Sequence, residues 1–206
     1  MEMKKIFFGL IFLAACMAMP AHAIGLKGGI SWDMSTTLGK YTKFANMYSM
    51  RGGSIWVDFN VTKHWAVGID AGFHQLYENK DRASFELAPG SVVTASTYNR
   101  LYDIPVMATL KYTIIARGIL HPYVGIGIGA VYTREEIIFM DMALREKSWN
   151  FGLAPTVGIQ LTFGQRIPVG LNIFAKYGLS FNKYTYRGED LNPYQYFNVG
   201  VGLLFQ

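Results

Sequence analysis

The sequence predicts an all-β protein, an eight-stranded antiparallel transmembrane β-barrel, on three observations. Apolar side chains alternate with small or polar ones along many segments of the 206-residue chain, as in strands with one face in oil. After the N-terminal region, no segment holds 18 continuous apolar residues, which argues against membrane-spanning helices. Charged residues make up 16% of the chain, against roughly 25% in soluble domains. Part of the surface is therefore expected to face lipid.

The N-terminus has the features of a secretory signal peptide. Lys4-Lys5 precedes an apolar run over residues 6–18, which is shorter than the about 20 residues that span a bilayer. Pro20 and a small-residue tripeptide that ends at Ala23 follow this run, so we predict cleavage between Ala23 and Ile24. The chain is then divided into a signal peptide, residues 1–23, and an outer-membrane β-barrel domain, residues 24–206.

Cys16 offers an alternative maturation site. The segment Leu13-Ala14-Ala15-Cys16 resembles a lipobox, in which Cys16 would be lipidated and become the mature N-terminus. We favour cleavage at Ala23, because Pro20 interrupts the hydrophobic helix where signal peptidase cuts. Cys16 is the only cysteine, so cleavage at Ala23 leaves a mature protein with no disulfide and no Cys-based metal site.

The segment 169–181 shows the strand pattern most clearly. Seven apolar residues from Val169 to Phe181 occupy every second position, and Gly, Asn, Lys and Ser fill most positions between them. One face of this strand is expected to contact lipid and the other the barrel interior. The same alternation predicts eight strands, at residues 24–34, 50–60, 64–77, 98–113, 122–134, 148–163, 168–181 and 194–205.

The predicted connections alternate in length, which is typical of small outer-membrane barrels with short periplasmic turns and long extracellular loops. The long, polar connections are residues 35–49, 78–97, 135–147 and 182–193, and the short ones are 61–63, 114–121 and 164–167. Closure into a barrel removes exposed strand edges and satisfies the backbone groups in lipid. A soluble β-sandwich is the alternative, but it would need a second apolar sheet face to cover the first.

Aromatic residues gather near the predicted strand ends, where rings can lie at the lipid headgroups. The expected periplasmic girdle is Trp65, Tyr112, Tyr123, Phe163 and Phe205, and the expected outer girdle is Trp32, Tyr77, Tyr132, Trp149, Phe181 and Phe197.

Three segments resemble known outer-membrane barrel sequences. The C-terminal segment 198–205 is similar to the targeting signature of outer-membrane barrels, with Asn198, Gly200, Leu203 and Phe205 at the expected spacing. Residues 100–112 and 121–127 resemble the "LEIP…LKY" and "PYVGAGIG" strands of the outer-membrane-protein β-barrel domain family, the OmpA/OmpX-like and opacity-like porin group. The resemblance implies a bacterial outer-membrane location and recognition by the barrel-assembly machinery. It says little about activity, because the family is functionally mixed.

Several polar residues are expected on the interior face of the strands. They are Asp58, Asp70, His74, Asp103, Lys111, Gln160, Asn172 and Lys176. Eight strands leave an interior that side chains just fill, so we expect these residues to pair into a polar plug whose charges nearly balance. A narrow porin-like channel for small solutes is the alternative interpretation.

A lipid A-modifying enzyme is a second alternative, and the sequence favours it less. Such an enzyme needs a nucleophile beside a base. Of the histidines, only His74 lies near the predicted outer rim, and it lacks the His-x-Ser spacing of lipid A deacylases; Ser84 or Ser96 would have to approach it. No sequence pattern indicates a metal, nucleotide or other cofactor.

These observations predict a non-enzymatic membrane scaffold, or a protein for surface contact or adhesion through its extracellular loops. The expected partners are outer-membrane lipid, lipopolysaccharide, the barrel-assembly machinery during biogenesis and a surface ligand whose identity the sequence does not give. The net charge of +5 comes without a dense Lys/Arg run, so no nucleic acid is expected as a partner.

Overall fold

The computed structural model describes most of the predicted barrel domain. The described residues are 25–43, 48–88, 91–139, 142–163, 169–181, 185–186, 189–190 and 192–205. The predicted signal peptide and its cleavage site between Ala23 and Ile24 lie outside them. Within these ranges, no helix is long and apolar enough to cross a membrane.

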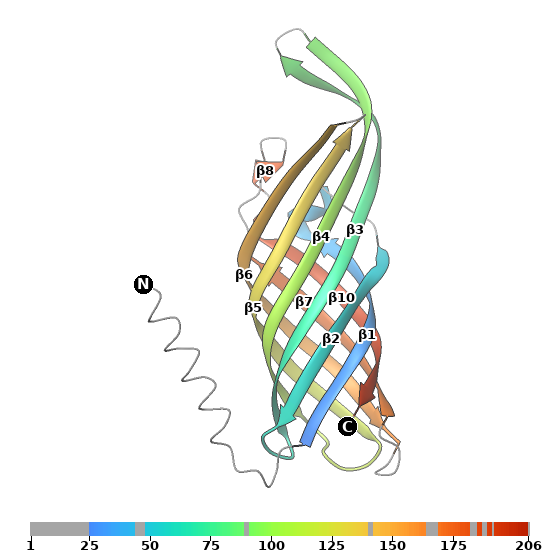
Figure 1. Ribbon diagram of the computed structural model, residues 1–206, viewed down its shortest axis with the longest axis vertical. Helices are drawn as coiled ribbons and strands as arrows, with labels where there is room; N and C mark the ends of the chain where they lie inside the picture. Colours follow the sequence, from blue (N-terminus) through green and yellow to red (C-terminus); the bar gives the residue numbers. More distant parts are fainter. Residues whose placement is uncertain are drawn as a thin grey trace, which may run out of the picture.

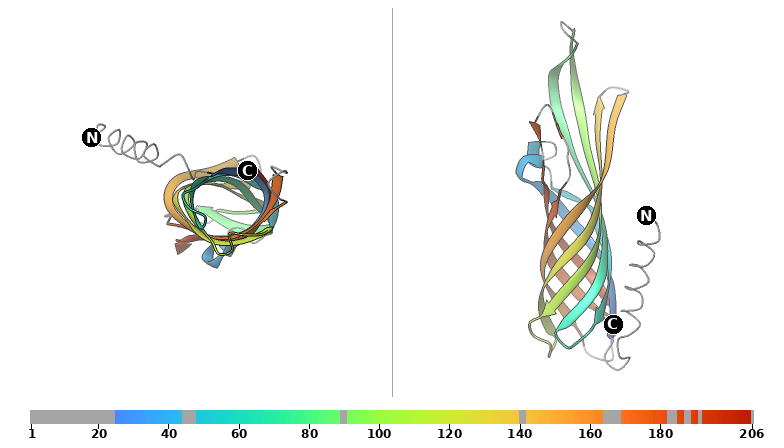
Figure 2. Two further views of the ribbon diagram at one scale, coloured as in Figure 1. Left: turned by 90° about the horizontal axis from the view of Figure 1, so that it is seen from below. Right: turned by 90° about the vertical axis from the view of Figure 1, so that its left-hand side faces the viewer.

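Eight antiparallel strands close into a barrel, which confirms the predicted fold class (Figure 1). Each strand pairs with its neighbour in the chain, and β1 pairs with β10 to close the ring, which Figure 2 shows from below. The barrel strands are β1 (Gly25–Leu38), β2 (Ser49–Asn60), β3 (Trp65–Ala88), β4 (Ser91–Thr113), β5 (Leu120–Phe139), β6 (Met142–Thr162), β7 (Val169–Ser180) and β10 (Tyr194–Phe205). A short 3-10 helix, η1 (Gly39–Lys43), follows β1, and β8 (Thr185–Tyr186) pairs with β9 (Glu189–Asp190).

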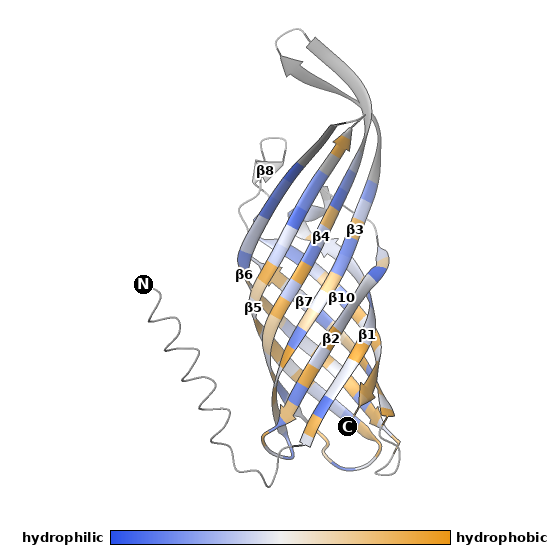
Figure 3. Ribbon diagram, viewed as in Figure 1, coloured by the Kyte–Doolittle hydropathy of each residue, from blue (hydrophilic) through white to orange (hydrophobic). Residues whose placement is uncertain are grey.

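The outer face of the barrel is apolar and its inner face is small or polar. On β10, Val199, Val201 and Leu203 point outward and are 40–48% exposed, whereas Gly200 and Gly202 between them are buried. The same alternation produces the band of apolar residues around the lower part of the barrel in Figure 3. Because apolar side chains favour hydrocarbon over water, this band defines the part of the barrel that lies in lipid.

The prediction of long loops is wrong for two of the four segments. Most of residues 78–97 and 135–147 extend the β3–β4 and β5–β6 hairpins, which remain paired as far as Ala88↔Ser91 and Phe139↔Met142. Likewise, β1 continues to Leu38 instead of ending at 34. Outside lipid both faces of a hairpin can be polar, so the period-two signal vanishes although the backbone pairing continues.

Two pairs of the predicted girdle aromatics pack together, and one predicted member lies elsewhere. Trp65 packs against Tyr112 at the short-turn end, with ring centroids 4.9 Å apart, and Tyr132 packs against Trp149 at the other end at 5.1 Å. Tyr123 was expected in the periplasmic girdle but is buried inside the barrel. It lies on the same face of β5 as the glycines at 125, 127 and 129, and its ring occupies the space that a Cβ on Gly158 of β6 would fill.

Interior glycines let large rings fill the barrel. A Cβ built on Gly178 would overlap the ring of Tyr196, and one built on Gly29 would overlap the indole of Trp56. Trp56 and Tyr196 are each 2% exposed. The interior is therefore packed by side chains, as the geometry of eight strands requires.

Candidate functional site

The barrel interior holds a series of buried ion pairs. Nearest the short turns, Lys111 on β4 donates from Nζ to Asp58 Oδ2 on β2 at 2.7 Å. The same ammonium group lies 4.8 Å from the centroid of the Trp56 ring. Both charged side chains are at least nine-tenths buried, so each depends on the other for compensation of its charge.

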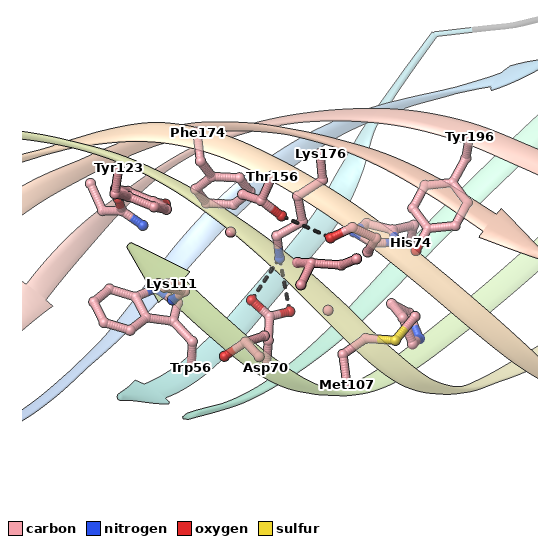
Figure 4. A pocket seen from close by; sticks show the side chains of 17 residues that line it. Trp56, Asp70, His74, Met107, Lys111, Tyr123, Thr156, Phe174, Lys176 and Tyr196 are labelled. Atoms are coloured by element: carbon pink, nitrogen blue, oxygen red, sulfur yellow. Dashed lines mark hydrogen bonds and ion pairs between the residues drawn. The ribbon is translucent and has the colours of Figure 1, made fainter. Parts of the chain in front are cut away.

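A second ion pair crosses the lumen. Lys176 on β7 donates from Nζ to both carboxylate oxygens of Asp70 on β3, at 2.8 and 2.6 Å (Figure 4). Strands β3 and β7 are not neighbours in the sheet, so this pair joins two separate parts of the barrel wall. The Lys176 ammonium also lies 4.6 Å from the centroid of the Phe174 ring.

A third cluster surrounds His74, nearer the outer end. Its Nδ1 lies 2.9 Å from Asp103 Oδ1, and its Nε2 lies 3.3 Å from Asp33 Oδ2. The side-chain nitrogen of Asn198 lies 2.8 Å from the same Nε2. His74 is 2% exposed, and both ring nitrogens are engaged by polar groups.

The two remaining residues of the predicted interior set lie on adjacent strands. Asn172 Oδ1 accepts a hydrogen bond from the Tyr123 hydroxyl at 3.2 Å. Gln160 on β6 is buried and lies opposite Asn172 in the β6–β7 register. The structure therefore places all eight residues of the set inside the barrel, six of them in three charged clusters.

Sequence reasoning missed Asp33 as an interior residue and assigned Asn198 only to the assembly signature. A signal for Asp33 was present, because Ser31, Asp33 and Ser35 alternate with larger residues such as Trp32. Ser31 donates to Asp33 at 2.7 Å, and Ser35 donates to Asn198 at 2.9 Å. These hydroxyl groups connect the His74 cluster to the β1–β10 seam.

The signature residues Asn198, Gly200, Leu203 and Phe205 all lie on β10, the strand that closes the ring. Leu203 pairs with Ile30, and Phe205 pairs with Gly28 on β1. Their recognition by the assembly machinery remains a prediction.

A small cavity lies between the Lys111 and Lys176 ion pairs (Figure 4). The centre of a water molecule can occupy ≈ 20 Å³ of it, enough for about one ordered water. Trp56 Nε1 and Thr109 Oγ1 lie at this cavity and have no hydrogen-bond partner among the described residues. The cavity is therefore suited to internal water and is too small for a solute.

Aromatic rings cover the outer end of the interior. Tyr41 from η1 packs edge-on against Tyr194 at 4.7 Å, and Tyr194 stacks on Tyr196 at 5.3 Å between ring centroids. The Tyr41 hydroxyl donates to Glu135 Oε1 at 3.0 Å. Glu135 lies three residues beyond Tyr132, outside the apolar band, and burial raises the pKa of its carboxyl group to about 7.

The other two histidines in the described part of the chain do not form a reactive group with His74. His64 and His121 lie at the short-turn end, where their Nδ1 atoms contact the carbonyl oxygens of Thr113 and Ile115 at 2.7 and 3.0 Å. The side chains of Ser84 and Ser96 lie outside the described part of the structure. In that described part, no group of three or more His, Cys, Asp and Glu residues is placed to hold a metal ion.

Comparisons with known proteins agree with this architecture. The family model for the outer membrane protein beta-barrel domain matches residues 8–205. Among solved structures, the chain is similar to Neisserial surface protein A (NspA), with 12% identity, a TM-score of 0.50, and coverage of 87% of this chain and 94% of that one.

It is also similar to the outer membrane protease OmpT from Escherichia coli, with 8% identity, a TM-score of 0.50, and coverage of 91% and 99%. Ail, the attachment invasion locus protein of Yersinia pestis, is 15% identical, with a TM-score of 0.41 and coverage of 88% and 97%.

No curated protein matches the sequence. At these identities the structural likenesses show only the fold, and the neighbours range from surface proteins to a protease. The family match covers nearly the whole chain and confirms the resemblance of the two strand motifs and the predicted location. The chain belongs to the outer membrane protein β-barrel domain family, whose members lie in the bacterial outer membrane.

Proposed function

We propose that this protein is a non-enzymatic outer-membrane anchor that makes surface contacts through a four-stranded sheet beyond the membrane. The observation that carries this proposal is the unequal length of the strand ladders. The β2–β3 ladder ends at Gly52↔His74, whereas β3–β4 continues to Ala88↔Ser91. On the other side, β6–β7 ends at Gly152↔Ser180, whereas β5–β6 continues to Phe139↔Met142.

Strands β3 to β6 therefore project past the barrel rim as two long hairpins, which the right-hand view of Figure 2 shows, and the β4–β5 ladder joins these hairpins into one sheet as far as Thr97↔Phe139. Beyond the rim, no further strand of the described residues is laddered to the far side of β3 or of β6. Exposed strand edges can pair with an extended segment of another protein, which is a common mode of peptide recognition. With the short turns in the periplasm, these edges lie outside the cell.

The interior supports a structural role instead of catalysis or transport. Within the described residues, the hydrogen bonds of His74 go to Asp103, Asp33 and Asn198, with no hydroxyl or thiol group among them, and His74 is 2% exposed, so a substrate has little access to it. The lumen is crossed by the Asp70–Lys176 pair and holds space for about one water. We therefore expect no steady conductance in planar bilayers, and no change in lipid A mass on expression, with or without His74→Ala.

Shortening the β3–β4 hairpin tests the surface-contact role without removing the barrel. Asn79 and Tyr98 are register partners, so an Asn-Gly turn can replace residues 80–97 and close the hairpin at that level. Cells that display the wild-type protein are expected to adhere to epithelial monolayers or to immobilised fibronectin, laminin or collagen. Cells with the shortened hairpin are expected to adhere no better than cells with an empty vector.

The control replaces residues 80–97 with a Gly-Ser segment of equal length, which keeps the length but removes the paired edge. Both variants should retain heat-modifiable migration on gels, which reports an intact barrel. Adherence of the shortened variant at the wild-type level would overturn the proposal, as would wild-type adherence no greater than the empty vector on every surface. Steady single-channel currents would favour the porin-like alternative.

A further inference from the structure

We propose that a basic belt on the outer wall of the barrel binds the phosphate groups of an anionic lipid in the outer leaflet. The basic belt consists of Arg51, Arg100, Arg134, Arg145 and Lys147 on strands β2 and β4 to β6. It lies just beyond the apolar band, on the wall that faces lipid. This inference is independent of the surface contact proposed for the projecting sheet.

The register places the belt directly above an aromatic row. Tyr132 and Trp149 are partners on β5 and β6, and Trp149 is 66% exposed. One row closer to the cell exterior, Arg134 pairs with Lys147. In the row beyond that, Glu136 pairs with Arg145. The upper strands of Figure 3 become hydrophilic at this level.

The same two rows continue onto neighbouring strands. Arg134 pairs with Tyr102 on β4, and its guanidinium lies 5.5 Å from the centroid of that ring. Arg100 pairs with Glu136 on one side and with Tyr77 on the other. The guanidinium of Arg51 lies over the Tyr77 ring at 4.9 Å, which extends the belt to β2.

The height of the belt matches the lipid headgroups. Two residues rise about 6.6 Å along a strand, and the strand tilt reduces this to about 5 Å of height for each row. The headgroup region is roughly 5–8 Å thick on each side of the hydrocarbon core. If the Tyr132–Trp149 row marks the edge of the core, as interfacial aromatics do, the Arg134–Lys147 row lies about 5 Å above it, among the headgroups, and the Glu136–Arg145 row lies about 10 Å above it, at their outer edge.

The charges of the belt are not balanced by carboxylates in the same rows. Glu136 is the acidic residue among these register partners, and it contacts both Arg134 and Arg145, the latter at 3.0 Å. Its side chain is 4% exposed, whereas that of Arg145 is 56% exposed. The buried carboxylate of Glu136 therefore fixes the positions of two guanidinium groups. Arg145 is still exposed enough to bind an anion from outside the protein.

This chemistry selects a phosphate. Guanidinium groups bind phosphate oxygens through paired charge-assisted hydrogen bonds, and neighbouring tyrosine rings can pack against a lipid. A zwitterionic headgroup gains less, because its own cation is repelled by the belt. Lipids with phosphate monoesters, such as lipid A, carry the required charge on the outer leaflet.

The test compares two variants with the same loss of charge, using the full mature chain in zwitterionic detergent micelles. Arg145→Gln/Lys147→Gln removes the two cations that β6 contributes to the belt, both of which are exposed. The control, Lys63→Gln/Arg117→Gln, removes two exposed cations at the short turns. Native mass spectrometry measures the apparent Kd for diphosphoryl lipid A, and phosphatidylcholine, phosphatidylglycerol and inorganic phosphate are measured in parallel.

We expect the belt variant to bind diphosphoryl lipid A about tenfold more weakly than wild type, with the control variant unchanged. The affinity should fall as salt is raised, and phosphatidylcholine should bind weakly to all three proteins. An equal loss of lipid A affinity in the belt and control variants would overturn the proposal, as would equal affinity of the wild type for phosphatidylcholine and lipid A. Inorganic phosphate that competes fully at lipid concentrations would show that the belt binds free anions and would also overturn it. Heat-modifiable migration confirms that each variant is folded.

Discussion

The charges inside the barrel and the charges on its outer rim follow opposite arrangements. In the lumen, Lys111 and Lys176 each have a carboxylate partner within 2.8 Å, and all four side chains are mostly buried. On the rim, Glu136 contacts Arg134 and Arg145 of the basic belt, and Arg145 nevertheless remains more than half exposed. This difference indicates that lumen charges act on stability, whereas rim charges are available to an external anion.

The largest effect is expected from breaking a lumen pair. Lys111→Met leaves Asp58 buried without its cation, so the free energy of unfolding should fall by about 3–5 kcal/mol. Urea unfolding in micelles, followed by tryptophan fluorescence, measures this loss. The double variant Asp58→Leu/Lys111→Met should recover much of it, because no uncompensated charge remains. Arg145→Gln, on the exposed rim, should change stability by less than about 1 kcal/mol; equal effects of Lys111→Met and Arg145→Gln would contradict the comparison.

A smaller effect is expected from crowding the interior. Gly178→Ala places a Cβ where the Tyr196 ring lies, so the ring must move, at a cost of about 1–3 kcal/mol. Gly28→Ala is the matched control, because its new Cβ would meet Trp56 O at 3.4 Å, an ordinary contact. The stability of both variants is measured as the temperature at which the compact band of the folded barrel disappears on gels. If adding Tyr196→Leu restores the stability of Gly178→Ala, the strain lies in this contact. A Gly178→Ala variant as stable as wild type would refute the prediction.

The smallest of these effects concerns pH at the outer end of the interior. Burial raises the pKa of Glu135 from 4.5 to about 7, the Tyr41 hydroxyl opposes this shift, and the nearby Glu146 adds to it. The folded state therefore holds a proton that the unfolded state releases between pH 4.5 and 7. Stability should be highest below this window, fall as pH rises through it, and level off above it.

Glu135→Gln cannot ionise, so it should remove this part of the pH dependence. Relative to wild type, the variant should gain about 1–2 kcal/mol at pH 8 and little at pH 4.5. Thermal unfolding in micelles at the two pH values measures the difference. A wild-type protein that becomes more stable as pH rises from 5 to 7, with Glu135→Gln showing the same slope, would rule out this origin.

The membrane part of the fold was predictable from the sequence because lipid imposes a strict pattern. Residues in the predicted strand 168–181 must place apolar groups in lipid at every second position, and this span differs from the observed Val169–Ser180 by one residue at each end. The strands beyond the rim were not predictable in the same way. At 78–97 and 135–147 the sequence loses the regular alternation of apolar and polar residues, and only the backbone pairing shows that the strands continue.

The candidate sites were also predictable only in part. Alternation alone placed Asp58, Asp70, His74, Asp103 and Lys111 on the interior face. It could not say that Lys176 reaches Asp70 across the lumen, because that contact depends on how the sheet closes and tilts. The same limit hid Asp33 beside His74, and it hid the basic belt, whose members are separated by many residues along the chain.

The sequence by itself thus determined the strand periodicity, the inward and outward faces, and the family, since each follows from local residue order in contact with lipid. Only the tertiary structure decided which interior charges pair, how far the hairpins project, and which cations align outside the membrane. These features depend on the register between strands, and register is set by the closed sheet as a whole and not by any one segment.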